Sequence, residues 1–160
     1  MQTAQSTLNK NLIERVAMGD MLRRRARDTA NREALVDFAY GKRRSLSYCE
    51  FNSQVNRLVR GLRDHKLQQG DVLALLCSNR IEFMLFAFAC YKAGIIFMPI
   101  NFLQSADDIR YNLEHAEASA IVFEPNLAQL ALECADGLER ISVRVAIGQQ
   151  ADDGCVASDG

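Results

Sequence analysis

The side chains of this 160-residue sequence that could act as catalysts or metal ligands are few and scattered. A zinc site needs clustered ligands, and neither His65 nor His115 has a cysteine or another histidine at ligand spacing. Both histidines fall near the ends of predicted helices, where a positive charge suits the helix dipole. General acid–base catalysis needs a partner group, and none is evident beside either histidine. We therefore assign neither histidine a catalytic or metal-binding role.

The glycines are also spaced in a way that argues against nucleotide chemistry. Phosphate-binding loops use closely spaced glycines, which let backbone N–H groups approach the anion. The nine glycines contain no GxG pair, and none precedes a Lys-Ser or Lys-Thr dipeptide. The sequence therefore lacks a dinucleotide fingerprint and a Walker loop, and it also lacks a GxSxG nucleophile motif. We predict no catalytic, cofactor-binding or metal-binding residue in this chain.

Five cysteines are present, and none of them belongs to a CxxC pair. Cys49, Cys77 and Cys90 fall within or beside apolar stretches, so we interpret the cysteines as reduced and mostly buried, as in a cytoplasmic protein. The formal net charge of -1 gives no general attraction to nucleic acid. The basic cluster at residues 23–27 would spread around a helix, and we interpret it as a solvated face.

The most apolar run, residues 81–100, would nearly span a bilayer, but two charges, a glycine and a proline interrupt it. A buried helix that leads into a buried strand explains this run better than a transmembrane segment. Residues 1–10 are polar and contain no apolar core of a signal peptide. We therefore expect a cytoplasmic chain with no transmembrane segment.

The first elements that the sequence predicts are a helix and a β-hairpin. Asp20 can cap a helix over residues 21–29. A strand over residues 34–38 is followed by a turn at residues 40–42 and by a second strand that ends near Ser47. Two short strands joined by a glycine-containing turn are typical of a hairpin.

Two further helices surround a strand that should lie in the middle of a sheet. Ser47 and Glu50 have the spacing of a capping box, and apolar residues follow them at helical spacing. Residues 72–77 are six consecutive apolar residues, which predict a parallel strand buried on both faces. Asn79, with Glu82 three residues later, can cap a second helix that is apolar on nearly all sides.

The rest of the chain continues the alternation of strands and helices. Gly94 can end the buried helix, and Pro99 should end the strand over residues 95–98 that follows it. The later elements are a helix capped by Ser105, a strand over residues 120–123, a helix opened by Pro125 and a strand over residues 141–147. This order predicts an α/β fold, with a mostly parallel sheet, helices on both of its faces and a preceding β-hairpin.

Composition divides the chain into three parts. Residues 1–17 form an N-terminal extension, and residues 18–148 contain all the predicted elements. Residues 149–160 are small and polar without periodicity, so we expect a loop or a disordered tail.

Several stretches of the predicted α/β region carry a resemblance to a known family. They are residues 56–62, 70–83, 88–94, 99–101 and 108–116. Their order and spacing resemble the start of the AMP-forming acyl-CoA synthetases, which are adenylating enzymes. The matching residues, among them Gly70, Gly94 and Pro99, fill scaffold positions. The resemblance therefore indicates an incomplete N-terminal domain of such an enzyme and identifies no active-site residue.

The resemblance implies an acid–thiol ligase. Members of the family use ATP and magnesium to convert a carboxylic acid to an acyl-adenylate, and then pass the acyl group to CoA. Their phosphate loop is rich in Ser, Thr and Gly, and this chain has only three threonines, Thr3, Thr7 and Thr29, so it cannot contain that loop. We therefore expect ATP, magnesium and CoA to be required by the full-length parent, and the chain alone to bind none of them and to be inactive.

Two alternatives stay open at this point. One is a non-catalytic binding or interaction module on the same scaffold, and the other is a different adenylating enzyme, such as an amino-acid-activating domain or a luciferase. Asn79 and Arg80 follow a predicted parallel strand, where open α/β sheets usually bind ligands, so Arg80 could contact a CoA phosphate in a complete enzyme. We favour helix capping for Asn79 and a solvated helix start for Arg80.

Overall fold

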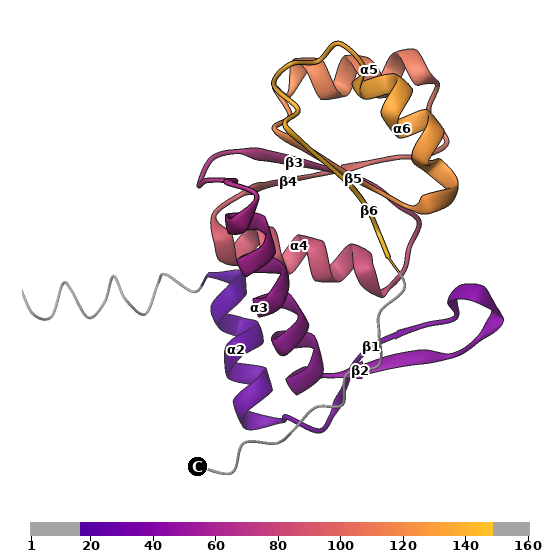
Figure 1. Cartoon of the computed structure of the whole chain (residues 1–160). Coiled ribbons are helices and arrows are strands. Elements are labelled where there is room, and N and C mark those ends of the chain that lie inside the picture. Colours follow the sequence, from indigo (N-terminus) through magenta and orange to yellow (C-terminus); the bar gives the residue numbers. More distant parts are fainter. Residues whose placement is uncertain (1–16, 149–160) are drawn as a thin grey trace, which may run out of the picture.

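A four-stranded parallel sheet organises residues 17–148, the part of the chain that the structure, a computed structural model, describes (Figure 1). Its strands are β3 (Val72–Leu76), β4 (Ile96–Ile100), β5 (Ala120–Phe123) and β6 (Val143–Ala146). They lie in the order β4-β3-β5-β6, and every neighbouring pair is parallel. The two earlier strands, β1 (Glu33–Asp37) and β2 (Arg44–Ser47), form a separate antiparallel hairpin.

Helices cover both faces of this sheet (Figure 1). One face carries α3 (Tyr48–Asp64) and α4 (Ile81–Ala93), against which α2 (Met18–Asp28) packs, and the other face carries α5 (Ala106–His115) and α6 (Ala128–Ala135). Short 3-10 turns at Ala39–Gly41 and Pro125–Leu127 connect the hairpin strands and lead into α6. The predicted α/β class, with a parallel sheet, helices on both faces and a preceding hairpin, is confirmed.

The central strand β3 shows why the sheet needs two helical layers. Leu73 and Leu75 point into the core beneath α3 and α4, whereas Ala74 and Leu76 point into the core beneath α5 and α6. All four side chains are fully buried. A strand that is buried on both faces reads as a continuous apolar run, so the prediction made from residues 72–77 is confirmed.

The structure corrects the predicted end of β4. Pro99 does not end this strand but lies within it, opposite Leu75 of β3, and the pairing continues to Ile100. The strand is at the edge of the sheet and pairs on one side only. An edge strand tolerates proline because only part of its backbone takes part in the ladder.

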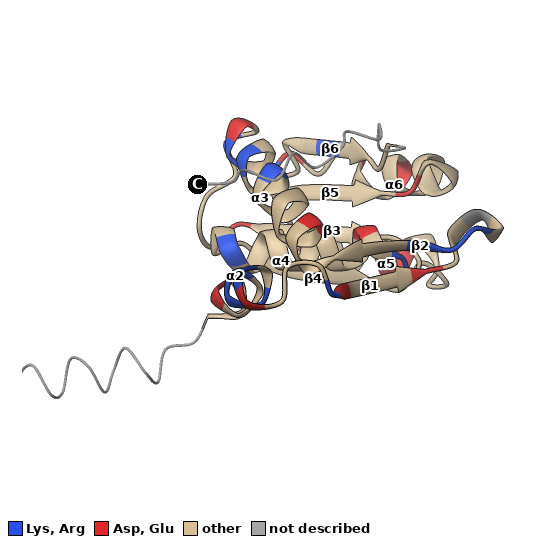
Figure 2. Ribbon diagram, turned by 90° about the horizontal axis from the view of Figure 1, so that it is seen from below, with Lys and Arg blue, Asp and Glu red and all other residues tan. Residues whose placement is uncertain are grey.

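The start of α2 also differs from the prediction. The helix begins at Met18, and Asp20 is not its cap but lies in the first turn, 3.1 Å from Arg23. The buried residues of α2 are Gly19 and Leu22, so packing against the neighbouring helices already begins before Asp20 and extends the helix. Basic and acidic positions are interleaved on α2 (Figure 2), and its four arginines are exposed, which confirms the solvated face.

The apolar run at residues 81–100 forms α4 followed by β4, as predicted. None of the helices between residues 17 and 148 combines the length and the apolar character that a membrane crossing needs. Cys77, Cys90 and Cys134 are buried and Cys49 is partly buried, which confirms the predicted burial of these four cysteines. Cys155 lies outside the described residues. The proposed tail and residues 1–16 of the proposed extension also lie outside them.

The predicted capping box at the start of α3 is confirmed. Ser47 Oγ accepts a hydrogen bond from the backbone N–H of Glu50 at 3.3 Å. In return, Glu50 Oε2 accepts from the backbone N–H of Ser47 at 2.7 Å. Two backbone donors that the first turn leaves free are thus satisfied by two side chains.

We expect the substitution Ser47→Ala to lower the free energy of unfolding by about 1 kcal/mol, because it removes the acceptor for the N–H of Glu50. Urea denaturation followed by circular dichroism measures the change. Ser53→Ala is the matched control, because Ser53 is an exposed residue within α3 and alanine is the better helix former there. A loss of similar size in both variants would contradict the capping explanation.

Candidate functional site

The carboxyl ends of β3 and β5 meet at the edge where parallel α/β sheets usually bind ligands. Residues 77–80 follow β3, and the buried Glu124 follows β5. Glu124 Oε1 accepts hydrogen bonds from Ser78 Oγ at 2.6 Å and from the Ser78 backbone N–H. One carboxylate therefore ties the two strand ends together.

A chain of ion pairs starts at this carboxylate and runs toward α4. Arg80 Nη1 lies 3.4 Å from Glu124 Oε2, and Arg80 Nε donates to Glu82 Oε2 at 2.7 Å. The Arg80 side chain is only 6% exposed. The interpretation of Arg80 as a solvated helix start is therefore wrong. The turn before α4 directs this guanidinium into the protein, where two carboxylates compensate the cost of its desolvation.

The hairpin supplies the next members of this chain. Arg44 of β2 donates from Nη1 to Glu82 Oε1 at 2.8 Å and from Nε to Asp37 Oδ1 at 2.9 Å. Asp37 belongs to β1 and is itself buried. We call Asp37, Arg44, Arg80, Glu82 and Glu124 the ionic network. It joins the hairpin to the start of α4 and to the carboxyl end of the sheet.

The ionic network also caps α4, which corrects the role predicted for Asn79. Asp37 Oδ2 accepts a hydrogen bond from the backbone N–H of Ile81 at 2.8 Å. The N-cap position is Arg80, and no side chain at this position makes a capping bond. Asn79 is exposed. A carboxylate from the hairpin therefore supplies the acceptor that the sequence suggested would come from Asn79.

All three carboxylates of the ionic network have lowered pKa values. Hydrogen bonding to Arg44 is the main cause for Asp37 and brings its pKa to about 2. Burial raises the pKa of Glu82, but hydrogen bonds from Arg44 and Arg80 outweigh it. Burial likewise raises the pKa of Glu124, and hydrogen bonds from the neighbouring serine outweigh it. At neutral pH the network therefore holds three carboxylates and two guanidinium groups, a net charge of -1.

This arrangement offers little to a nucleotide or a metal ion. Each carboxylate is already occupied by arginine, serine or backbone donors. No group of His, Cys, Asp and Glu side chains between residues 17 and 148 could hold a metal ion. Burial, with the nearby Glu124, raises the pKa of the Cys77 thiol, which keeps it protonated and unreactive. At this edge of the sheet, the residues of the ionic network therefore do not fit the ATP and magnesium that the family resemblance implies.

The two histidines lie where the sequence placed them. His65 is the residue directly after α3, and His115 is the last residue of α5. The His115 ring stacks on Tyr111, with ring centroids 5.4 Å apart. These positions agree with a favourable interaction with the helix dipole.

Comparisons with known proteins decide the family. Residues 22–159 match the family described as AMP-binding enzyme, which is most of the chain. The chain belongs to this family. The resemblance read from the scaffold residues is thereby confirmed.

Proteins similar to this chain include curated CoA ligases and synthases. The chain is 32% identical to a feruloyl-CoA synthase of Amycolatopsis over 93 residues, which are 58% of this chain and 19% of that protein. It is 28% identical to a long-chain-fatty-acid–CoA ligase of Thermus thermophilus over 144 residues, 90% of this chain and 27% of that one. The chain thus spans about a fifth to a quarter of these curated relatives.

A solved structure gives the same answer for the fold. The Mycobacterium tuberculosis fatty acyl CoA synthetase superposes with a TM-score of 0.73 at 25% identity, covering 81% of this chain and 26% of that chain. The parallel sheet, its two helical layers and the hairpin therefore match the fold of part of that synthetase.

Proposed function

We propose that this chain forms the N-terminal part of an acid–thiol ligase, an AMP-forming acyl-CoA synthetase. The full-length parent would activate a carboxylic acid with ATP to an acyl-adenylate and would transfer the acyl group to CoA. The match to the AMP-binding enzyme family over residues 22–159 carries this proposal. The names of the matched relatives, a feruloyl-CoA synthase and a fatty-acid–CoA ligase, support an organic acid as the substrate.

We further propose that residues 18–148 are the N-terminal part of the adenylation domain, in a cytoplasmic protein, and that they supply scaffold rather than catalysis. Adenylyl transfer depends on positioned groups that stabilise charge on the transferring phosphate. Glu124 places a carboxylate at the carboxyl end of the sheet, where it would repel a phosphate. Arg80 and Arg44, which could attract one, are held by carboxylates of the same network.

We expect the purified 160-residue chain to release no AMP when it is incubated with ATP, magnesium, CoA and a panel of aromatic and fatty acids. Coupled detection of AMP measures the turnover, and a curated relative such as the feruloyl-CoA synthase serves as the positive control. We also expect calorimetric titration with ATP to show no tight binding. Turnover, or tight nucleotide binding, would contradict the assignment of a scaffold role.

The same titrations address the other candidates. A stand-alone binding module on this scaffold would bind ATP, an acyl-adenylate analogue or CoA without turnover. An amino-acid-activating or luciferase-type parent is distinguished by the coding sequence downstream of Gly160. An acyl-CoA synthetase requires that a Ser/Thr/Gly-rich phosphate loop and the machinery for CoA follow there.

A further inference from the structure

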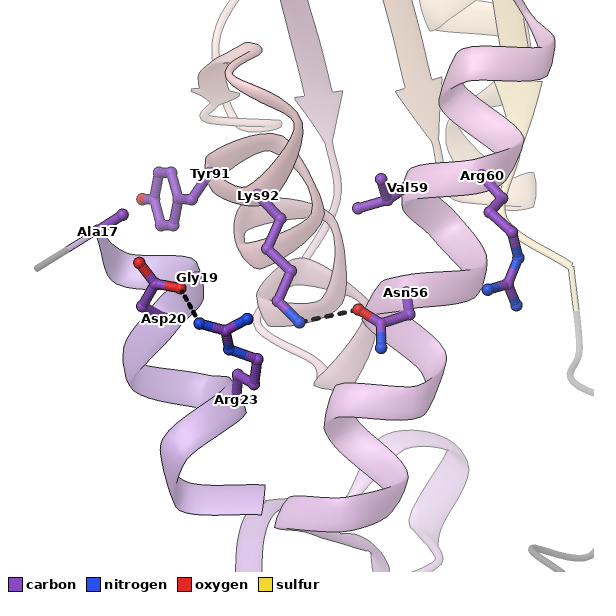
Figure 3. Close-up of a pocket in the computed structure, with 9 residues that line it drawn as sticks. All are labelled: Ala17, Gly19, Asp20, Arg23, Asn56, Val59, Arg60, Tyr91 and Lys92. Atoms are coloured by element: carbon purple, nitrogen blue, oxygen red, sulfur yellow. Dashed lines mark hydrogen bonds and ion pairs between the residues drawn. The ribbon is translucent and has the colours of Figure 1, made fainter. Parts of the chain in front are cut away.

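A cleft lies where α2, α3 and α4 meet (Figure 3). It has a volume of about 480 Å³. Its lining residues are Ala17, Gly19, Asp20 and Arg23 of the α2 region, Asn56, Val59 and Arg60 of α3, and Tyr91 and Lys92 of α4. Lys92 is near the end of α4, whereas the ionic network is at its start, about 18 Å away along the helix at 1.5 Å per residue. The cleft is therefore separate from the carboxyl edge of the sheet.

Lys92 is a partly buried ammonium group that no carboxylate neutralises. Its Nζ donates to Asn52 Oδ1 at 2.6 Å and to Asn56 Oδ1 at 2.9 Å. Both acceptors are neutral amides, and no ion pair among residues 17–148 includes Lys92. Burial, together with the nearby Arg23, lowers the pKa of Lys92, and Asp20 offsets only part of this. A bound anion would stabilise a partly buried cation that only neutral groups contact.

The packing of α2 against α4 fixes the position of this lysine. A Cβ atom at Gly19 would lie only 2.5 Å from Lys92 Cγ and 3.4 Å from its Cα. The glycine therefore allows α2 to lie directly on the stem of Lys92, which leaves the ammonium group directed toward α3. The two amide acceptors then hold that end, so the donor is positioned before any ligand arrives.

A second cation points into the same space. The Arg23 side chain extends from α2 toward Lys92, so two positive groups face one another across the cleft (Figure 3). Asp20 pairs with Arg23 at 3.1 Å, but both side chains of this pair are largely exposed, and solvent weakens the pair. Arg60 also belongs to the lining, but its guanidinium points away from Lys92 (Figure 3), so two neighbouring cations, Lys92 and Arg23, face one carboxylate. The excess of positive charge favours an anionic ligand.

We propose that this cleft binds the phosphate group of a small phosphorylated molecule, with Lys92 and Arg23 as the groups that contact the phosphate. Guanidinium and ammonium groups commonly donate hydrogen bonds to phosphate oxygens in proteins. Val59 and Tyr91 give the cleft an apolar wall, against which the organic part of such a molecule would rest. The proposal uses only residues of this chain and does not depend on the acyl-CoA synthetase assignment.

Equilibrium dialysis of the full 160-residue chain against radiolabelled inorganic phosphate tests the proposal at low salt. We expect saturable binding of one phosphate per chain, with a Kd on the order of 1 mM, as a few charge-assisted hydrogen bonds would give. Glycerol phosphate should displace the labelled phosphate. Absence of saturable binding, or failure of glycerol phosphate to compete, would overturn the proposal.

Variants separate the cleft from general attraction between charges. Arg23→Gln should weaken phosphate binding about tenfold, and because Arg23 is 77% exposed this variant should fold normally. Lys92→Met should weaken it by at least as much. Arg24→Gln is the matched control: it removes the same charge from a neighbouring exposed position of α2 outside the lining, and we expect its Kd to stay within about twofold of the original. Equal losses in Arg23→Gln and Arg24→Gln would contradict a defined site.

Discussion

The substitution Arg80→Met is expected to lower the free energy of unfolding by about 3 kcal/mol, because it removes one partner from a buried set of ion pairs. Arg80 contacts both Glu82 and Glu124. Glu82 would keep its pairing with Arg44, but Glu124 would be left buried without a cation. A loss of this size is a large fraction of the stability of a typical domain.

Arg43→Met is the control for this prediction. Arg43 pairs with Glu33 through two short hydrogen bonds of 2.7 and 2.8 Å, so its geometry is at least as good as that of Arg80. The two side chains are 51% and 46% exposed, however, and solvent screens such a pair, so we expect Arg43→Met to lower the free energy of unfolding much less than Arg80→Met does. Urea denaturation of both variants measures the difference. Equal losses would show that burial does not set the strength of the ionic network.

The conservative variant Arg80→Lys distinguishes charge from geometry at the same position. Lysine keeps the positive charge but lacks the planar guanidinium that reaches two carboxylates at once. We expect its stability to fall between those of the original chain and Arg80→Met. A lysine variant as unstable as the methionine variant would mean that the two-sided contact, and not the charge, holds the hairpin and the sheet edge together.

The elements that the sequence predicted well are those whose signals are local. Ser47 and Glu50 are three residues apart, so the capping box is visible as a pattern. The strand over residues 72–76 is buried on both faces, and such burial leaves a continuous apolar run. The order of such elements along the chain then restricts the fold, because parallel strands require helical crossovers.

The features that the sequence missed depend on contacts between distant segments. Asp37 caps α4 at Ile81, 44 residues away, and Glu124 accepts from Ser78 over 46 residues. Nothing near Asn79 indicates that a carboxylate from the hairpin takes the position expected for its side chain. In the same way, the local sequence indicates an exposed charge at Arg80, because folding alone brings Glu82 and Glu124 beside its guanidinium.

The cleft of Lys92 and Arg23 escaped the sequence for a related reason. Arg23 reads as one member of a solvated cluster, and Lys92 reads as a charge near the end of an apolar helix. Only Gly19 carries a signal in principle, since a glycine within a helix often marks a close approach of another element. A glycine does not indicate which element approaches it. The proximity of Arg23 and Lys92 therefore follows only from the packing of α2 against α4 in the structure.

The substitution Gly94→Ala is expected to lower the free energy of unfolding by about 2 kcal/mol. Gly94 ends α4 in a left-handed conformation with φ at 73°, which costs any residue with a Cβ atom. The added Cβ would also lie 2.9 Å from Gln69 Cγ. The backbone N–H of Gly70 donates to the carbonyl oxygen of Gly94 at 2.9 Å. A displacement of residue 94 by the added Cβ would therefore also displace the loop before β3.

Gly61→Ala gives the opposite sign and is the matched control. Gly61 lies within α3, its φ is not positive, and nothing within 4 Å would meet an added Cβ. Alanine is favoured over glycine in a helix interior by about 1 kcal/mol, so this variant should be more stable than the original chain. Urea denaturation measures the free energy of unfolding of both variants. It compares a glycine in a left-handed turn with a glycine in a helix interior. Equal stability of Gly94→Ala and Gly61→Ala would contradict this prediction. It would mean that neither the left-handed conformation of residue 94 nor its close approach to Gln69 requires glycine.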